Sequence, residues 1–246
     1  MTAARPATLF AETTCTAPPE RSDRMRDIVL AHVPPDRAIR VLDIGCGNGS
    51  LLFRLAEALP NATLVGIDIS PANILAANDQ QTDRGPARRV HFQVADYLHY
   101  RADPFDAIVT DGVLHLVRGD TGDLVSRLAG DLRTGGVLVC GMPFDCAYNR
   151  AFAVLRRMLR KIRSPWLDRA ILQAARIVHG REMDDDRLRE RVGYMYIPPE
   201  RTMGRTLARR FASAGLHRTA EYPMKSTSPS QLKHRVTIFE RSTPAR

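Results

Sequence analysis

The sequence predicts an α/β domain built on a parallel sheet with helices on both faces. Its middle part alternates short apolar runs with helix-like stretches, the pattern of a covered parallel sheet. The first apolar run, Arg40–Ile44, ends in a glycine-rich turn that opens a helix. The chain has 246 residues, 44% of them hydrophobic. A single domain of this size buries roughly 70% of its unfolded surface, which is enough for a sizeable core.

The first half of the chain supplies three predicted strands and the helices that join them. After Arg40–Ile44, the segment Ser50–Leu59 carries its apolar residues at helical spacing. Thr63–Ile67 is the second strand, and Ser70-Pro71 begins a helix, with serine as N-cap and proline in the first turn. Val90–Val94 is the third strand. Each strand is thus followed by a crossover, as parallel pairing requires.

Two more strands follow in the same alternating pattern of strand and helix. Ala107–Thr110 is the fourth predicted strand, preceded by a Pro-Phe-Asp turn. Leu124–Leu132 reads as a helix stopped by Gly135-Gly136, and Val137–Cys140 as the fifth strand. These elements extend the predicted sheet to five strands.

The alternation of predicted strands and helices stops after the fifth strand. Residues 145–198 contain no convincing strand, only two or three helix-like segments that are broken by Pro165, Gly180 and Gly193. The α/β pattern then returns with one helix and two β-like runs, Thr202–Ala214, Leu216–Pro223 and Leu232–Glu240. We therefore expect a helical insertion in an α/β sheet domain.

Charge and cysteine content narrow the class of protein. The formal charge is +9, and only three basic residues are lysines. This balance suits nucleic acid, an anionic membrane or an acidic small molecule, and it equally fits an arginine-biased genome. The four cysteines form no C-x-x-C pair, so we expect reduced thiols and no metal site. No apolar window approaches the ~18 residues of a membrane span, and we expect a cytoplasmic protein.

The strongest chemical signal is the run Val41–Gly49, which reads V-L-D-I-G-C-G-N-G. Glycine permits positive φ and close approach of a ligand to the backbone. A pyrophosphate-binding turn usually has G-x-G-x-x-G spacing, whereas this run has G-x-G-x-G with Asp43 two residues earlier. That acid would repel a diphosphate and suits the ammonium of an amino-acid moiety. The run therefore favours a cationic ligand over a dinucleotide.

This run resembles the first motif of class I S-adenosylmethionine-dependent methyltransferases, [VIL]-L-[DE]-x-G-C-G-x-G. The resemblance implies a Rossmann-like seven-stranded, mostly parallel sheet of order 3-2-1-4-5-7-6, with the last strand antiparallel. It implies S-adenosyl-L-methionine as cofactor, with Asp43, Gly45 and Gly47 around its methionine part. Cys46 and Asn48 belong to the same expected site.

The second and third motifs of that family also have counterparts. The resemblance implies that Asp68 binds the ribose hydroxyls and that Ile69 packs on adenine. The alternative for Asp68 is a helix-capping role. A dinucleotide-binding enzyme also requires an acid at this position, so this motif does not separate the two classes. After the third strand, Asp96 is expected near the adenine amine with Ala95 and Tyr97 beside the ring. A surface turn is the alternative for Asp96.

The fourth motif spans Phe105–Val117 and resembles the small-molecule methyltransferase pattern F-D-x-[VI]-x-x-x-x-x-L-H-x-[VI]. It implies that Thr110 and Asp111 face the sulfonium, although family members often carry Ser-Asn there. His115 would lie between cofactor and acceptor. Its ordinary pKa near neutrality suits a general base. Positioning and simple packing are the alternatives for this histidine.

The insertion is expected to cover the acceptor pocket. Residues 150–163 form a basic amphipathic helix, with Arg156, Arg157, Arg160 and Lys161 opposite an apolar face. That face could pack on the domain, line an apolar pocket or attach to an anionic membrane. Phe152, Tyr194 and Tyr196 are the predicted acceptor-binding residues. Arg201 and Arg205 are expected to be solvated.

The sequence therefore predicts methyl transfer to an oxygen or nitrogen of a small, partly apolar metabolite. The expected organisation is an N-terminal arm (1–24), a methyltransferase domain (25–144 and 199–246) and a helical insertion (145–198). Motifs typical of nucleic-acid methyltransferases are missing, which disfavours nucleic acid as the acceptor. An RNA-modifying enzyme, a nucleotide-dependent oxidoreductase and a non-catalytic binding module are the alternatives. In-line methyl transfer needs no metal.

Overall fold

The computed structural model describes residues 17–83, 89–179, 185–225 and 231–242 of the chain. Seven strands form one sheet in the order β3-β2-β1-β4-β5-β7-β6. The pairs among β1 to β5 are parallel, and β7 runs antiparallel to both β5 and β6. The predicted fold class and strand order are confirmed.

Most of the predicted elements are present, and three strands have the bounds that the sequence predicts: β1, β3 and β6. The strands are β1 (Arg40–Ile44), β2 (Thr63–Asp68), β3 (Val90–Val94), β4 (Phe105–Asp111), β5 (Leu132–Pro143), β6 (Leu216–Pro223) and β7 (His234–Arg241). The helices are α2 (Pro19–Leu30), α3 (Ser50–Ala58), α4 (Pro71–Asp83), α5 (Thr121–Asp131), α6 (Ala147–Lys161), α7 (Pro165–His179), α8 (Asp185–Tyr194) and α9 (Arg205–Ser213).

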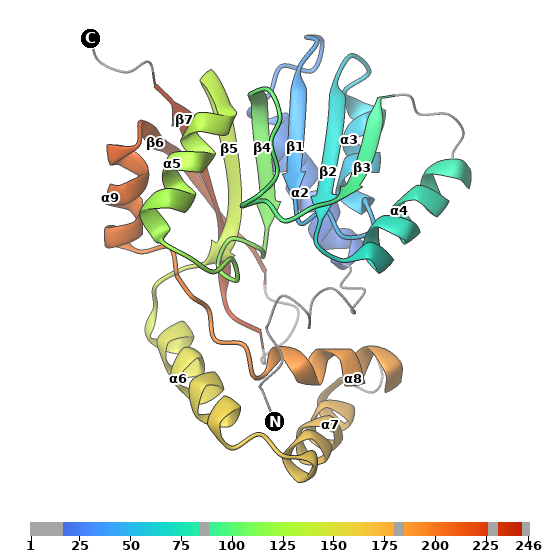
Figure 1. Ribbon diagram of the computed structural model, residues 1–246, viewed down its shortest axis with the longest axis vertical. Helices are drawn as coiled ribbons and strands as arrows, with labels where there is room; N and C mark the ends of the chain where they lie inside the picture. Colours follow the sequence, from blue (N-terminus) through green and yellow to red (C-terminus); the bar gives the residue numbers. More distant parts are fainter. Residues whose placement is uncertain (1–16, 84–88, 180–184, 226–230, 243–246) are drawn as a thin grey trace.

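Helices cover the sheet on both faces (Figure 1). Side chains alternate across a strand, so successive residues of β1 and β4 enter different cores. Val41 and Val109 belong to one core cluster with residues of α2, α3 and α4. Leu42 and Ile108 belong to a second cluster with residues of α5 and α9. Both faces of the central strands are therefore buried, as parallel sheets require.

Helix α5 differs from the prediction at both ends. It begins at Thr121 because the Asp120 carboxylate accepts the N–H groups of Gly122 and Asp123, at 2.6 and 3.0 Å. It ends at Asp131 because Leu132 is extended and begins β5. The Gly-Gly pair at 135–136 lies inside β5, so its predicted role as the helix stop is wrong.

The chain enters and leaves the helical insertion at one point. The Asp145 N–H donates to the Met203 carbonyl at 2.9 Å, and the Met203 N–H donates to the Pro143 carbonyl at 2.8 Å. Between these contacts, α6, α7 and α8 lie beyond the carboxyl edge of the parallel strands (Figure 1). The sequence places a helix break at Gly180, which lies outside the described residues.

Helix α2 begins within the segment that the sequence predicts to be an arm. Its Met25, Ile28 and Val29 are buried in the same core cluster as α3. Residues 1–16 of the predicted arm lie outside the described residues. Within the described residues, no helix combines the length and apolar character needed to cross a membrane.

Candidate functional site

The glycine-rich loop joins β1 to α3 at the carboxyl edge of the sheet. Gly45 and Gly49 have φ of 76° and 78°, in the left-handed region that favours glycine. A Cβ on Gly45 would lie 2.2 Å from Val113, and one on Gly49 would lie 2.5 Å from Phe92. Gly47, at φ 55°, donates its N–H to the Asp68 carboxylate at 2.9 Å. The loop therefore requires glycine for conformation and for space.

Three aspartates surround this loop. Asp43 is the penultimate residue of β1 and is 4% exposed. Burial first, and then the negative charges of Asp111 and Asp68, raise the pKa of Asp43 to about 8. A buried acid whose charged neighbours are other acids is costly to ionise. The site thus gains by receiving a positive charge.

Asp68 organises the start of the next helix as well as the loop. Its two carboxylate oxygens accept the N–H groups of Gly47 and Ser70, at 2.9 and 2.8 Å. The helix cap is Ser70, whose hydroxyl accepts the Asn73 N–H at 3.3 Å. The predicted serine cap is present. Ile69 is partly exposed between the two.

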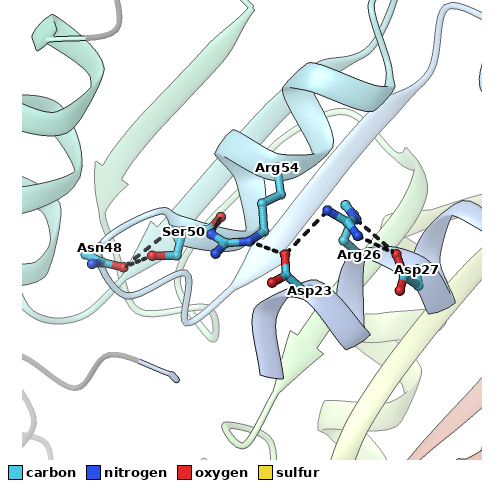
Figure 2. A network of polar contacts seen from close by, with 6 residues as sticks. All are labelled: Asp23, Arg26, Asp27, Asn48, Ser50 and Arg54. Carbon is cyan, nitrogen blue, oxygen red and sulfur yellow. Dashed lines mark hydrogen bonds and ion pairs between the residues drawn. The ribbon is translucent and has the colours of Figure 1, made fainter. Parts of the chain in front are cut away.

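The remaining loop residues support its shape. The Asn48 side-chain oxygen accepts hydrogen bonds from the Ser50 N–H and hydroxyl, at 3.3 and 2.7 Å (Figure 2). The Cys46 thiol is buried, and burial raises its pKa. A Cβ on Gly66 would lie 2.8 Å from that sulfur. Strand β2 therefore approaches the loop closely only because residue 66 is glycine.

A pocket of about 310 Å³ lies beyond β3 and includes two predicted cofactor residues. It is lined by Gln93, Ala95, Asp96, His99, Tyr100 and Arg101. Asp96 also accepts the Leu98 N–H at 2.9 Å, a local turn contact. Tyr97 points elsewhere: it is buried in the core and donates its hydroxyl to Asp131 at 2.9 Å.

Strand β4 ends in Thr110 and Asp111. Thr110 is fully buried, and its hydroxyl has no hydrogen-bond partner among the described residues. Arg21 of α2 holds Asp111 with two hydrogen bonds of 2.5 Å. A Cβ on Gly141 would lie 2.4 Å from the Asp111 carboxylate, so β5 makes room for this pair.

Helix α2 is fixed against α3 next to the glycine loop. Arg54 of α3 donates to Asp23 of α2 at 2.7 Å, and Arg26 lies 3.4 Å from the same oxygen (Figure 2). Arg54 also donates to the Ser50 carbonyl at 3.1 Å. These contacts set the position from which Arg21 reaches Asp111.

His115 lies in the loop after β4 and is 5% exposed. Its ring centroid is 5.6 Å from that of His234, at the start of β7. Burial, and then the neighbouring His234, Arg156, Arg21 and Arg201, lower the pKa of His115 well below its usual value. Burial and Arg21 likewise lower the pKa of His234 to about 4. Both imidazoles are neutral near pH 7.

Arg201 holds the His115 loop in place. Its guanidinium donates to the carbonyls of Leu114 and Val117, each at 2.7 Å, and to that of Gly119 at 3.2 Å. The Glu200 N–H donates to the His115 carbonyl at 2.8 Å. The expectation of a solvated Arg201 is wrong, because these carbonyls would otherwise lack donors. Arg205 is exposed, as expected.

The insertion helix α6 packs on the domain through a partly polar face, and its apolar stripe faces solvent. Asn149, Ala153 and Arg156 are buried. Met158 and Ile162 of the predicted apolar face are 61% and 64% exposed. The reason lies at the sheet edge, where the Asn149 amide donates to the carbonyls of Phe144 and Lys233. Packing of the apolar stripe on the domain is therefore wrong.

The predicted acceptor residues lie on the insertion. Phe152 is partly exposed and stacks on Tyr148, with ring centroids 4.8 Å apart. The Arg163 guanidinium lies 4.7 Å from the ring centroid of buried Tyr196. Tyr194 is partly buried at the end of α8. Among the described residues, none of these three rings is in ring contact with His115, whose ring partner is His234, and their role stays a prediction.

Sequence reasoning missed the contacts of three arginines near the site: Arg21, Arg156 and Arg201. The contacts of Arg21 and Arg201 lie 90 and 82–87 residues away in the chain. No local motif marks such distant partners. Among the described residues, no group of three histidine, cysteine, aspartate or glutamate side chains could hold a metal ion.

Comparison with known proteins gives a consistent result. Residues 35–157 match the family described as a methyltransferase domain. A trans-aconitate 2-methyltransferase of Azoarcus sp. (strain BH72) is 34% identical over 151 residues, which cover 61% of this chain and 54% of that protein. The chain thus spans about half the length of the curated relatives it matches.

Solved structures share the fold at low sequence identity. One is magnesium protoporphyrin IX methyltransferase from Synechocystis PCC 6803 with bound SAH. It has a TM-score of 0.60 and 16% identity over 91% of this chain and 83% of that chain. Another is 1,6-didemethyltoxoflavin-N1-methyltransferase of Burkholderia thailandensis, with a TM-score of 0.59 and 14% identity over 91% and 79%. The sheet order, the glycine loop with its acids and the family match together lead to one conclusion: the chain belongs to the class I S-adenosylmethionine-dependent methyltransferases.

Proposed function

We propose that this chain binds S-adenosylmethionine at the carboxyl edge of the sheet and transfers its methyl group to an oxygen or nitrogen of a small, partly apolar acceptor. The observation that carries the proposal is the burial of Asp43 beside the glycine loop, where it is 4% exposed and where burial, Asp111 and Asp68 raise its pKa. Three carboxylates around a glycine loop, with Arg21 paired to one of them, favour a cationic ligand. A diphosphate would be repelled, which argues against the oxidoreductase alternative.

The residues of the site fit this cofactor. The ionised Asp43 would receive the ammonium group, next to the backbone of Gly45 and Gly47. Asp68 keeps acceptor capacity for ribose hydroxyls, because each carboxylate oxygen has two lone pairs and uses one for an N–H. We propose that the pocket lined by Ala95 and Asp96 takes the adenine.

S-adenosylmethionine supplies an electrophilic methyl group on its sulfonium sulfur. The protein has to align the acceptor with that group and exclude water, and alignment alone contributes on the order of 7–11 kcal/mol. Thr110 and Asp111 are the last two residues of β4, at the edge of the sheet that carries the site. Arg21 of α2 donates to Asp111 there. A neutral, weakly basic His115 is suited to positioning the acceptor and poorly suited to taking its proton.

The relatives support a small acceptor. The name of the Azoarcus enzyme gives trans-aconitate as its acceptor, and the Burkholderia structure holds 1,6-didemethyltoxoflavin with S-adenosylhomocysteine. We propose the same class for this chain, with α6 to α8 covering the acceptor.

The test has two steps on the full chain. Calorimetry with S-adenosylhomocysteine measures cofactor binding, and methyl-labelled S-adenosylmethionine then measures transfer to a metabolite panel that begins with trans-aconitate. We expect binding and transfer to at least one small molecule. Binding without any turnover would favour a non-catalytic module, and steeply salt-dependent affinity for RNA would favour an RNA acceptor.

A further inference from the structure

A second group of buried polar side chains lies next to the proposed donor site, and we call it the basic cluster: His115, Arg156 and His234. The three residues come from the loop after β4, from α6 and from β7. The two imidazole rings are in edge-to-face contact. Arg156 is 8% exposed although it belongs to a helix whose other arginines face solvent. The fold therefore buries this guanidinium, and its charge lowers the pKa of both imidazoles.

The basic cluster has unused hydrogen-bonding atoms. Arg156 donates to the Ile197 carbonyl at 3.3 Å through one terminal nitrogen. Within the described part of the chain, its Nε and the His115 Nδ1 are buried without a hydrogen-bond partner. Buried polar atoms are nearly always paired in native proteins. Two buried unpaired atoms, on side chains close enough to interact electrostatically, indicate a missing partner.

The cluster also has an uncompensated positive charge. Asp111, whose negative charge acts on His234, is already paired with Arg21. Burial lowers the pKa of Arg156, and the described group that opposes this effect is Tyr148, not an acid. A buried charge is normally paired, since desolvation otherwise destabilises the fold. A ligand anion would supply the pairing.

The chemistry of the transfer points to the same class of ligand. An alcohol or ammonium acceptor must lose a proton, and the two neutral imidazoles of the cluster are weak bases. A carboxylate is already ionised near pH 7. Its oxygen forms the new bond to the methyl carbon, the carbon–sulfur bond breaks, and the electron pair stays on sulfur. No proton moves, and the products are a methyl ester and S-adenosylhomocysteine.

We infer that the acceptor is a small carboxylic acid and that Arg156 binds one of its carboxylates, with His115 and His234 positioning it. The planar guanidinium matches a carboxylate with two parallel N–H donors. One unpaired cation suits a single carboxylate better than a phosphate dianion. This inference rests on the proposed methyltransferase function and names its acceptor class.

The experiment compares acceptors and variants of the full chain. Wild type is assayed for methyl transfer with matched pairs: succinate and succinamide, benzoate and benzamide, trans-aconitate and its trimethyl ester. Arg156→Gln removes the charge and Arg156→Lys keeps it. Arg157→Gln makes the same change one residue along, on the exposed face of α6. Calorimetry with S-adenosylhomocysteine reports on folding and on the donor site in every variant.

We expect turnover of acids and none of their neutral partners. Arg156→Gln should raise KM for the acid about 10–100-fold, as expected for one charge-assisted contact, while kcat changes less and affinity for S-adenosylhomocysteine is kept. Arg156→Lys should restore part of the loss, and Arg157→Gln should match wild type.

Several results would overturn the inference. These are preferred turnover of neutral or amine acceptors, an unchanged KM in a folded Arg156→Gln variant, and no turnover of any carboxylate by a wild type that binds S-adenosylhomocysteine. The preference of wild type for acids over amides decides the question even if Arg156→Gln does not fold. A wild type that binds no S-adenosylhomocysteine would instead remove the proposed donor site and this inference with it.

Discussion

Replacing Asp43 with asparagine should stabilise the ligand-free protein and weaken cofactor binding at the same time. The carboxyl group is fully enclosed at the end of β1, and its pKa is raised to about 8 by burial and by two neighbouring acids. In the unfolded chain the same group titrates near 3.8. Asparagine has a similar shape and carries no charge, so the variant avoids the cost of placing an acid there.

The magnitude follows from linkage. Between pH 3.8 and 7 the unfolded chain has released a proton that the folded chain still holds, so the stability of wild type falls as pH rises. At about 1.36 kcal/mol for each pH unit, this amounts to about 4 kcal/mol at pH 7. The asparagine amide must itself find hydrogen bonds, which reduces the gain to about 2–4 kcal/mol. The advantage should vanish near pH 4 and level off above pH 8.

Urea unfolding of the ligand-free protein from pH 4 to 8 measures this difference directly. Asp103→Asn is the matched control, because the Asp103 side chain is 92% exposed. In the same samples, affinity for S-adenosylhomocysteine should fall at least about tenfold in Asp43→Asn, through the loss of one charge-assisted hydrogen bond. Equal stability of variant and wild type at pH 7, or equal affinity for the ligand, would refute this account of Asp43.

Four further outcomes are expected. Gly45→Ala should cost about 1–2 kcal/mol in unfolding experiments and abolish S-adenosylhomocysteine binding, because φ is 76° and the new methyl group has no space; wild-type behaviour would contradict this. Arg201→Gln should lower the free energy of unfolding by about 1–3 kcal/mol and reduce kcat, with Arg205→Gln as the silent control. The pH profile of the rate should show no inflection near pH 6.5 from His115, because its pKa is far lower. An inflection near pH 6.5 that disappears in His115→Gln would refute the lowered pKa of this histidine. If α6 attaches to membranes, as residues 150–163 allow, anionic vesicles should sediment the protein and Met158→Glu should abolish the effect, whereas neutral vesicles should not bind it.

Local sequence was sufficient for the sheet and for the loop. The bounds of β1 and β3 follow from short apolar runs, and those of β6 from a β-like run that ends at Pro223. Ser70 caps α4 as its type and position predict. The glycine loop is equally local, since Gly45, Gly47 and Gly49 are required by backbone conformation within one turn. Strand bounds, helix caps and glycine turns depend on residues that are close together in the sequence, so they can be predicted from it.

The orientation of α6 could not be read from the sequence. Helical spacing separates an apolar face from a basic face, but it does not say which face is turned inward. Apolar residues are expected inside, yet here the covered surface is polar, with Asn149 satisfying two backbone carbonyls and Arg156 beside two histidines. Where a helix covers a polar site, its polar face is turned inward and its apolar face outward, opposite to the usual arrangement.

Contacts between distant segments were also beyond the sequence. Arg21 and Asp111 are separated by 90 residues, and Arg201 reaches carbonyls of a loop more than 80 residues earlier. Backbone acceptors leave no signature in the sequence at all. The predicted bounds of α5 are wrong for a simpler reason. A Gly-Gly pair in a strand resembles a helix stop, and the Asp120 N-cap starts the helix at Thr121 rather than at Leu124.

The central claim, that a buried aspartate and a glycine loop form a site for a sulfonium amino acid, is tested most directly by one titration. Calorimetry of the full chain with S-adenosylmethionine, S-adenosylhomocysteine and NADH, under identical conditions, compares the ligand classes. The account predicts saturable binding of both adenosyl amino acids at one site and no binding of NADH. Binding of NADH alone would contradict it.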